Sequence, residues 1–319
     1  MENNNDYIEN CEKFDVYYRE KIISVLQKQE KIRIKYLSIL ICLIAGIIIW
    51  CLLLGAKWRE EIFSNAENIS IFDWKVLPCF VILLICFPMF SYYKKSKENI
   101  LPLIINFFGN FSYDYQHQIS DSQLEKSKII KPYAYIKTDD CFNGEFESIP
   151  ITITEFTRYE QETYKENEVK KVRAVKKEHG ILFSAKMNKN FEGQTIIIKD
   201  KGLLNKFTHY KNLQRVGLES PEFEKAYEVY SDNQIEARYI LTTVMLEYLL
   251  ELKQIFPKTE MSFFDEKVLL KINIKENLFE CSSFFSSILN QKRIEKIFKQ
   301  FYLLFTIIKI MRLNQEHML

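Results

Sequence analysis

Residues 36–54 read YLSILICLIAGIIIWCLLL, a run in which Ser38 is the one clearly polar side chain. Twelve of its 19 positions are Leu or Ile, and each of these favours the membrane by roughly 0.3–0.6 kcal/mol on the insertion scale. A helix that rises about 1.5 Å per residue extends this run over about 28 Å, close to the hydrocarbon thickness of a bilayer. The run therefore predicts a transmembrane helix.

A second apolar run, Val76–Tyr93, follows after a short link. It contains Pro78 and Pro88, which break soluble helices but are tolerated near the ends of a spanning helix. Together the two runs predict a transmembrane helical hairpin over residues 36–93. The alternative, a pair of helices buried in a large soluble core, fits the length of the first run less well. A cleaved signal peptide fits worse, because a charged segment precedes the first run and basic residues follow it.

The charges around the hairpin predict its orientation. The link from Lys57 to Lys75 holds three basic residues against four acidic ones. The flanks are richer in positive charge, with Lys21, Lys28, Lys31, Arg33 and Lys35 before the hairpin and Lys94, Lys95 and Lys97 after it. Because short loops rich in Lys and Arg stay in the cytoplasm, both termini are expected there. The three tryptophans, Trp50, Trp58 and Trp74, are then expected at the outer interface, where an indole ring is buried while its N–H stays hydrated.

Composition argues against several other classes of protein. The 44 basic and 42 acidic residues give a formal net charge of +2, so no overall field for capturing nucleic acid is expected. Four of the seven cysteines lie in the apolar runs, and Cys11, Cys141 and Cys281 form no C-x-x-C pair. Neither a zinc site nor a disulfide framework is indicated. The four histidines have no metal-like spacing and no nucleotide-binding fingerprint occurs, so we expect no cofactor and no metal.

Residues 1–35 are expected to form a cytosolic amphipathic helix. Apolar side chains recur there at near-helical spacing among charged ones, at Val16, Ile22, Ile23, Leu26 and Ile32. Such a helix could lie on anionic lipid headgroups, or it could pack as a stalk against a second helix. The second helix is indicated by Ile100, Leu103, Ile104 and Phe107. We favour the stalk interpretation.

Residues 94–319 are expected to form one cytosolic domain of the α+β class, an antiparallel sheet with packing helices. Alternation typical of strands occurs in four runs, residues 151–157, 181–185, 195–198 and 268–274. Glycines bound the first three of these runs, which is typical of an antiparallel meander. The highly charged stretch Tyr164–His179 is expected to project as a solvated hairpin arm.

Helix signals dominate the later part of the chain. Ser220 and Pro221 form an N-cap and first-turn pair. Ser231 and Gln234 have capping-box spacing before a longer helix that Pro257 ends. The expected shared face of this helix holds Ile235, Tyr239, Thr243, Leu246 and Leu250. A last helix over residues 294–313 is expected to cover one sheet face through Ile294, Phe298, Phe301, Phe305 and Ile308.

No constellation of residues in the sequence announces a reaction. Asp139, Asp140, Glu145 and Glu147 are the densest carboxylates, but an acidic turn beside a glycine is common at protein surfaces. If a catalytic site is assembled from distant residues, its candidates are Asp140, Glu155 and Arg238. We expect Arg238 to pair with Asp140 or Glu155 across the sheet, and a structural salt bridge is the simpler interpretation of such a pair.

Three stretches resemble an uncharacterised family of bacterial two-helix membrane proteins, the domain of unknown function 3137. They are DDCFNGEFESIPITITE (Asp139–Glu155), GILFSAKMNKNFEGQTIIIKD (Gly180–Asp200) and VGLESPEFEKAYEVYSDNQIEARYILT (Val216–Thr242). The resemblance implies a two-helix anchor in the bacterial inner membrane that carries one α+β cytosolic domain, and it implies no established reaction. Relatives tend to place a proline shortly after the last stretch, where this chain has Thr242 and Thr243.

Two functional hypotheses follow from the sequence. The first is a membrane-anchored binding or scaffolding module that presents its sheet or its charged arm to a protein partner or to lipid headgroups. The second is a membrane-tethered enzyme whose site is assembled from distant residues. Association of the spanning helices into a homo-oligomer is a further alternative, although Gly46 and Gly55 are isolated small positions without a G-x-x-x-G motif.

Overall fold

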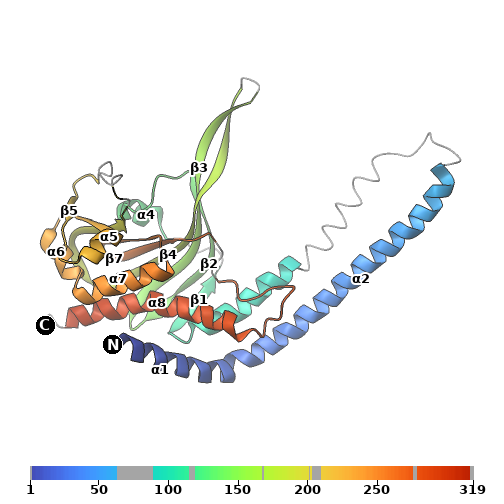
Figure 1. Ribbon diagram of the computed structural model, residues 1–319, viewed down its shortest axis with the longest axis horizontal. Helices are drawn as coiled ribbons and strands as arrows, with labels where there is room; N and C mark the ends of the chain where they lie inside the picture. The colour runs from blue at the N-terminus through green and yellow to red at the C-terminus, as the bar shows by residue number, and fades with distance from the viewer. Residues whose placement is uncertain are drawn as a thin grey trace. The chain divides into compact units, whose positions relative to one another are not determined.

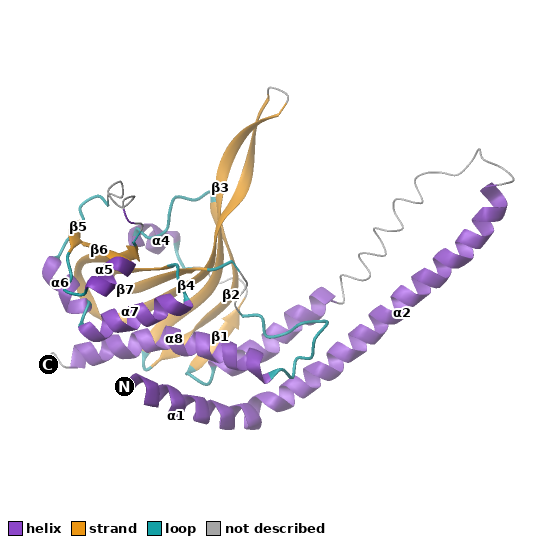
Figure 2. Ribbon diagram, in the orientation of Figure 1, coloured by secondary structure: helices purple, strands orange, loops and turns teal. Residues whose placement is uncertain are grey.

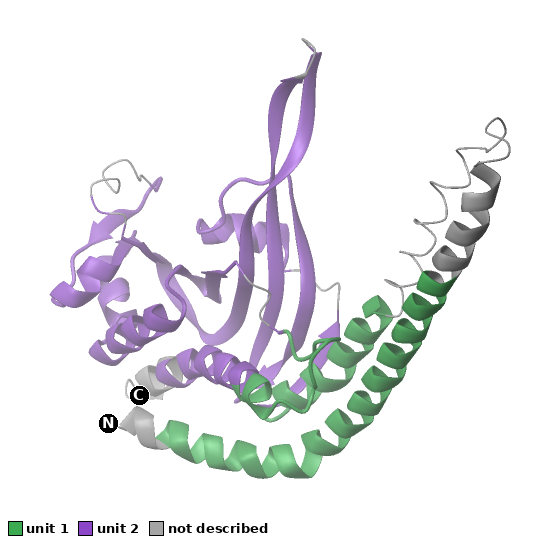
Figure 3. Cartoon of the chain, turned by 45° about the vertical axis from the view of Figure 1, so that its right-hand side comes forward, with its two compact units in different colours: residues 1–107, 280–295 green, residues 108–279, 296–319 purple. Residues whose placement is uncertain are grey.

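The computed structural model describes residues 2–62, 89–114, 119–166, 169–200, 202, 210–275 and 279–316. Residues 76–88 of the predicted run Val76–Tyr93 therefore lie outside the described residues. The part of the link that follows Ile62 also lies outside them. The chain divides into two compact units (Figure 3). Unit 1 comprises residues 1–107 and 280–295, and unit 2 comprises residues 108–279 and 296–319.

Unit 1 is helical. Helix α1 (Glu2–Tyr17) continues through a π-helical segment (Tyr18–Ile22) into helix α2 (Ile23–Ile62), and residues 89–105 form a further helix. Within the described residues, no helix combines the length and the apolar character needed to cross a membrane. The side chains described for the run of residues 36–54 are those at positions 36–46, 48 and 49.

The buried stripe of the N-terminal helix differs from the predicted one. It consists of Phe14, Tyr18, Ile22 and Leu26, spaced four residues apart. Val16 and Ile32, which the spacing assigned to the stripe, are exposed. Positions four apart drift around an α-helix of 3.6 residues per turn, and the wider π-helical turn at Tyr18–Ile22 offsets that drift. Two aromatic residues, Phe14 and Tyr18, therefore share the buried side of the helix with Ile22 and Leu26.

The stalk packing expected from the sequence is confirmed. The hydroxyl of Tyr17 donates a hydrogen bond of 3.0 Å to the carbonyl oxygen of Leu103. The rings of Phe14 and Phe107 meet edge to face, with centroids 5.3 Å apart. Ile100 and the neighbouring apolar residues of the second helix are buried as well. The segment before residue 36 is thus anchored by contacts with the chain near residue 105.

A buried ion pair fixes the middle of this helix to the segment 280–290. Arg33 donates to both carboxylate oxygens of Glu30, at 2.9 and 2.7 Å, and to the carbonyl oxygen of Phe284, at 3.0 Å. The backbone N–H of Ile288 donates to Glu30 at 3.0 Å. The hydrogen bond from Arg33, supported by the bond from Ile288, lowers the pKa of Glu30 from 4.5 to about 2.

This lowered pKa predicts an acid-sensitive unit 1. Because the folded state has the lower pKa, the pair contributes its full stability above pH 4.5 and loses it as the pH falls toward 2. The contribution is about 3 kcal/mol by linkage. We expect Glu30→Gln to lower the free energy of unfolding at neutral pH and to flatten its fall with acid. Urea unfolding of both proteins between neutral pH and pH 3 measures this.

The exposed pair of Glu9 and Lys13 provides a matched control, because both side chains are more than half exposed. Glu9→Gln is expected to leave the pH profile of unfolding unchanged, since exposed ion pairs contribute little. Parallel acid profiles for the wild-type chain and Glu30→Gln would contradict the assignment.

Unit 2 contains an antiparallel sheet of seven strands within the described residues (Figures 1 and 2). The strands are β1 (Asn110–Asp114), β2 (Tyr135–Phe146), β3 (Ile149–Glu166), β4 (Val169–Lys199), β5 (Gln214–Val216), β6 (Tyr227–Ser231) and β7 (Thr259–Asn273). Their order is β1-β2-β3-β4-β6-β5, and β7 also pairs with β4. The α+β class and the antiparallel sheet expected from the alternating runs are confirmed.

Strand β4 organises the sheet because it changes partners along its length. It pairs with β3 up to Ala185, with β7 from Gly180 to Ile197, and with β6 from Thr195 onward. At Gly180 the backbones of β4 and β7 are so close that a Cβ atom would lie 1.8 Å from the carbonyl oxygen of Ile272. This glycine therefore marks a close approach of two strands in addition to the end of a predicted run.

The charged arm is confirmed as a projecting hairpin. The distal halves of β3 and β4 extend beyond the other strands as a two-stranded ribbon (Figure 1). Glu162 on β3 accepts from Lys177 at 2.5 Å and from Arg173 at 3.5 Å, both on β4. Cross-strand pairs of this kind stabilise a solvated ribbon by a few tenths of a kcal/mol each.

Helix α5 (Pro221–Ala226) begins as predicted. The hydroxyl of Ser220 accepts a hydrogen bond of 3.3 Å from the backbone N–H of Phe223. Pro221 occupies the first helical position, where its missing N–H costs nothing.

The single longer helix expected after Ser231 is wrong. Two helices occur, α6 (Gln234–Ile240) and α7 (Thr243–Ile255). Asn233 caps α6, while Ser231 lies at the end of β6. The hydroxyl of Thr242 accepts from the backbone N–H of Met245 and so caps α7, which supplies the break without a proline.

Because of this break, the predicted shared face is also wrong in its first half. Ile235 is 81% exposed and Tyr239 is 41% exposed. Met245, Tyr248, Leu249 and Leu252 of α7 form the buried side instead. The helical period restarts at the new cap, so residues before and after Thr242 do not share one stripe.

Opposite faces of the sheet carry two hydrophobic layers. Helix α8 (Gln291–Glu316) places Phe305 against Phe111, Phe146 and Phe183, with ring centroids 4.7–6.5 Å apart. The neighbouring residue Leu182 points to the other face. There it packs with Ile129 and with Leu124 of α4 (Asp121–Ser127). The predicted α8 stripe is confirmed, and all five of its residues are buried.

Candidate functional site

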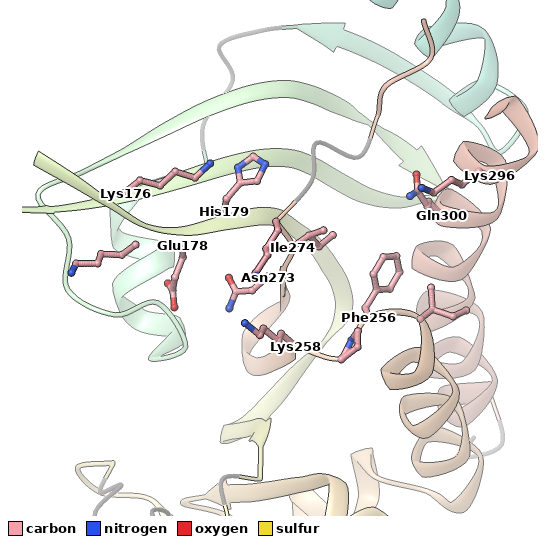
Figure 4. A pocket seen from close by; sticks show the side chains of 13 residues that line it. Lys176, Glu178, His179, Phe256, Lys258, Asn273, Ile274, Lys296 and Gln300 are labelled. Carbon is pink, nitrogen blue, oxygen red and sulfur yellow. The ribbon is translucent and has the colours of Figure 1, made fainter. Parts of the chain in front are cut away.

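A cavity of about 830 Å³ lies in unit 2 beside the base of the arm. Its walls come from the β4 residues next to the arm, the end of β7, the turn after α7 and the first turns of α8 (Figure 4). These four segments span more than 100 positions of the chain, and the pairing of β4 with β7 brings two of them together.

The rim of this cavity is strongly basic. Five lysines line it, namely Lys176, Lys177, Lys258, Lys275 and Lys296, against one carboxylate, Glu178. Lys177 pairs with Glu162 on the arm, and Glu178 accepts a 2.7 Å hydrogen bond from Arg158. In the described part of the chain the other four lysines form no ion pair. The cavity therefore presents four uncompensated positive charges.

The lining of the cavity combines polar and apolar side chains. Gln300 of α8 is 6% exposed, and its Oε1 accepts no hydrogen bond within the described residues. The same is true of Oδ1 of Asn273 at the end of β7. Phe256 and Ile274 supply apolar surface between them. Both oxygens keep free acceptor capacity for a donor that reaches them.

His179, which also lines the cavity, belongs to a buried polar cluster on β3 and β4. Its Nδ1 lies 3.0 Å from the carbonyl oxygen of Phe156 and 2.9 Å from Oγ1 of Thr157. Its Nε2 lies 3.1 Å from Oε1 of Glu155. Because a carbonyl oxygen only accepts, Nδ1 must carry a proton and cannot remove one from Thr157. The arrangement is therefore structural and is not a nucleophile–base–acid triad.

Beneath the arm, Arg158 is 2% exposed and hydrogen-bonded through its Nε and Nη1. Its Nε donates to Glu178 at 2.7 Å, and its Nη1 donates to Glu160 and to the carbonyl oxygen of Pro132, both at 2.6 Å. These bonds join β3 to β4 and both strands to the chain before β2. They hold the cavity-lining part of β4 in place.

A second buried cation, Lys271 of β7, completes the network. It donates to Glu260 at 2.5 Å and to the carbonyl oxygen of Ile129 at 2.6 Å, and it lies 3.9 Å from Glu178. Glu178 is thus shared by cations on both strands that flank β4. The result is a platform of three strands, linked by ion pairs, that carries one wall of the cavity.

The three residues proposed from the sequence as catalytic candidates are placed differently from one another. Asp140 is fully buried at a bulge in β2 and accepts a 2.5 Å hydrogen bond from the hydroxyl of Tyr113. Glu155 lies on the neighbouring strand β3 and pairs with His179. Burial raises the pKa of the adjacent Cys141 thiol to about 11, so this thiol is not a nucleophile at neutral pH.

Arg238 does not join these carboxylates, contrary to the expected salt bridge across the sheet. It is exposed on α6 and donates to the backbone oxygen of Gln234 at 3.1 Å and to that of Gly217 at 3.4 Å. An arginine one turn after the start of α6 reaches its own helix and the preceding loop more easily than a strand buried beneath them.

The sequence did not indicate the lysine-lined cavity, because the segments that form its walls are far apart in the sequence.

The fold and this site define an α+β domain with a basic cavity and without a recognisable catalytic constellation among the described residues. Residues 178–313 match the family described as "Protein of unknown function (DUF3137)". This match agrees with the resemblance found in the sequence. The match includes the residues that line the cavity except Lys176 and Lys177.

Two further comparisons add little. No curated protein matches the chain. Among solved structures, the chain is similar to one described as "crystal structure of the mycobacterial trehalose monomycolate transport factor A, TtfA". The identity is 12%, the match covers 62% of this chain and 88% of that chain, and the TM-score is 0.30. A similarity of this size does not establish a common fold.

Proposed function

We propose that this chain is a membrane-anchored binding module whose α+β domain faces the cytoplasm of a bacterial cell. The observation that carries the proposal is a set of exposed isoleucines on α2. Ile41, Ile48 and Ile49 are each more than half exposed, and Ile39 and Ile44 are each 41% exposed. At 100° per residue these five positions lie on most sides of the helix. A surface helix keeps a polar face, and this segment has none.

Lipid accounts for this exposure. Large apolar side chains exposed on several sides of one helix need an apolar surrounding, and Tyr36–Leu54 is long enough to extend through a bilayer. The basic residues that flank the apolar segments support a cytoplasmic position for the N-terminal stalk and for unit 2. The proposed localisation is the bacterial inner membrane.

Two features of unit 2 support binding as its role. The arm projects a ribbon in which Val169 and Val172 are exposed among charged side chains. The cavity collects uncompensated lysines on a platform fixed by Arg158 and Lys271. Both are surfaces suited to recognition, and the polar side chains closest to a catalytic geometry serve to hold β3 against β4.

Fractionation of cells that produce the full chain tests the anchor. We expect the protein in the membrane pellet, resistant to an alkaline wash and released by detergent. Recovery of the wild-type chain from the soluble fraction would overturn the proposal.

A further inference from the structure

We propose that the basic cavity of unit 2 binds a phosphate monoester. The inference deepens the proposed binding function by naming its ligand class, and it does not depend on the membrane anchor. Lys176 from β4, Lys258 from the turn after α7 and Lys296 from α8 line the same hollow (Figure 4). Lys275 after β7 lines it as well.

The charge of these lysines selects the ligand. Four ammonium groups without ion pairs repel one another around a single cavity, and a bound anion relieves that repulsion. A phosphate monoester carries about 1.5–2 negative charges near neutral pH, more than a carboxylate, and offers three acceptor oxygens. Lysine supplies three donors on a flexible stem, which lets ammonium groups from four separate segments converge on one phosphate.

The buried amides select what the phosphate is attached to. Oε1 of Gln300 and Oδ1 of Asn273 are acceptors without a donor within the described residues. A hydroxyl group on the ligand would supply the missing donor. Both oxygens are covered in this structure, so each amide must turn about its soft terminal torsion to meet a hydroxyl. A phosphorylated polyol satisfies the lysines and the amides together.

Two sources can supply this chemistry, and they differ in their hydroxyls. Glycerol 3-phosphate is soluble and keeps two free hydroxyls. Phosphatidic acid is a lipid that presents the same phosphate monoester on a glycerol whose hydroxyls are esterified. The lysines serve both ligands, whereas the amides favour the first. Phe256 and Ile274 provide apolar surface for the carbon skeleton of either.

The test is calorimetric titration of the purified full chain in neutral detergent. The probes are glycerol 3-phosphate, dioctanoyl phosphatidic acid, and uncharged glycerol as a blank. The variant is Lys258→Gln/Lys296→Gln, and the control is Lys170→Gln/Lys292→Gln, which removes two exposed lysines outside the cavity. We expect binding to weaken about tenfold or more in the variant, because two charge-assisted contacts are lost, and to stay unchanged in the control.

A third variant, Gln300→Leu, separates the two sources. We expect it to weaken binding of glycerol 3-phosphate about tenfold and to leave phosphatidic acid unaffected. Lysine-dependent binding of either probe supports the cavity, and the stronger probe identifies the source. Absence of binding by both probes, or an equal loss in the control variant, would overturn the inference. Because binding is measured in detergent, that failure is distinct from a failure of the membrane anchor. Matching thermal unfolding of all variants shows that each is folded.

Discussion

Introducing lysine at Ile44 and Ile48 is expected to move the full chain out of the membrane fraction. Both side chains are exposed on α2, near the middle of the run Tyr36–Leu54. A lysine at the centre of a spanning helix costs about 2.5–3.5 kcal/mol on the insertion scale. Two of them cost about 5–7 kcal/mol, which cancels the favourable contribution of the twelve Leu and Ile residues. The measurement is the soluble share of the protein after alkaline washing.

The matched control makes the same chemical change elsewhere on the helix. Ile8 and Val16 on α1 are also more than half exposed, but they lie before the apolar run. Ile8→Lys/Val16→Lys is expected to remain in the membrane fraction. If both double variants fractionated alike, exposure of isoleucine on α2 would have no connection with lipid.

Replacing Arg158 by methionine is expected to lower the free energy of unfolding of unit 2 by about 3–5 kcal/mol. The substitution leaves the carboxylates of Glu178 and Glu160 and the carbonyl oxygen of Pro132 without their shared donor. Glu178 retains Lys271 at 3.9 Å, which is too long for a hydrogen bond. Uncompensated buried charge, more than the lost packing of the arginine stem, determines the size of the effect.

Denaturant unfolding followed by tyrosine fluorescence measures this loss. Arg173→Met is the control, because the side chain of Arg173 is 61% exposed on the arm and its ion pair with Glu162 is long, at 3.5 Å. It is expected to change stability by less than about 0.5 kcal/mol. Equal effects of the two substitutions would show that the buried network contributes nothing beyond a surface pair.

Strands and the arm could be predicted from the sequence because their signal is local. Ile151, Ile153 and Phe183 alternate with residues of the other face, and short connections join β2 to β3 and β3 to β4. The length of β4 could not be predicted. Its first half is too charged to signal a strand, and β3 stabilises it through backbone pairing and cross-strand ion pairs along the arm.

The errors concern choices between competing local signals. Ser231 and Gln234 satisfy a capping-box pattern, but the hydroxyl of Ser231 bonds to Thr195 on β4 and leaves the cap to Asn233. Thr242 carries no helix-breaking signal of its own, yet its hydroxyl caps α7. Such choices depend on which partner the fold brings close, and the linear pattern does not contain that information.

The candidate site was the least predictable part. Asp140 and Glu155 were candidates for a site assembled from distant residues, whereas the structure pairs Asp140 with Tyr113 and Glu155 with His179. No pattern in the sequence distinguishes the lysines of the cavity from the rest of the 44 basic residues. The lysines gather around one cavity only in the folded domain, where β4 pairs with both β3 and β7.

The most direct test of the central claim determines on which side of the membrane the C-terminus and the link of the hairpin lie. A fluorescent protein or alkaline phosphatase is fused to the C-terminus of the full chain, and in parallel the phosphatase is inserted into the link between Lys57 and Lys75. A cytoplasmic unit 2 predicts a fluorescent C-terminal fusion, an inactive C-terminal phosphatase and an active phosphatase in the link. An active phosphatase at the C-terminus, or an inactive one in the link, would contradict a cytoplasmic module held by a membrane hairpin.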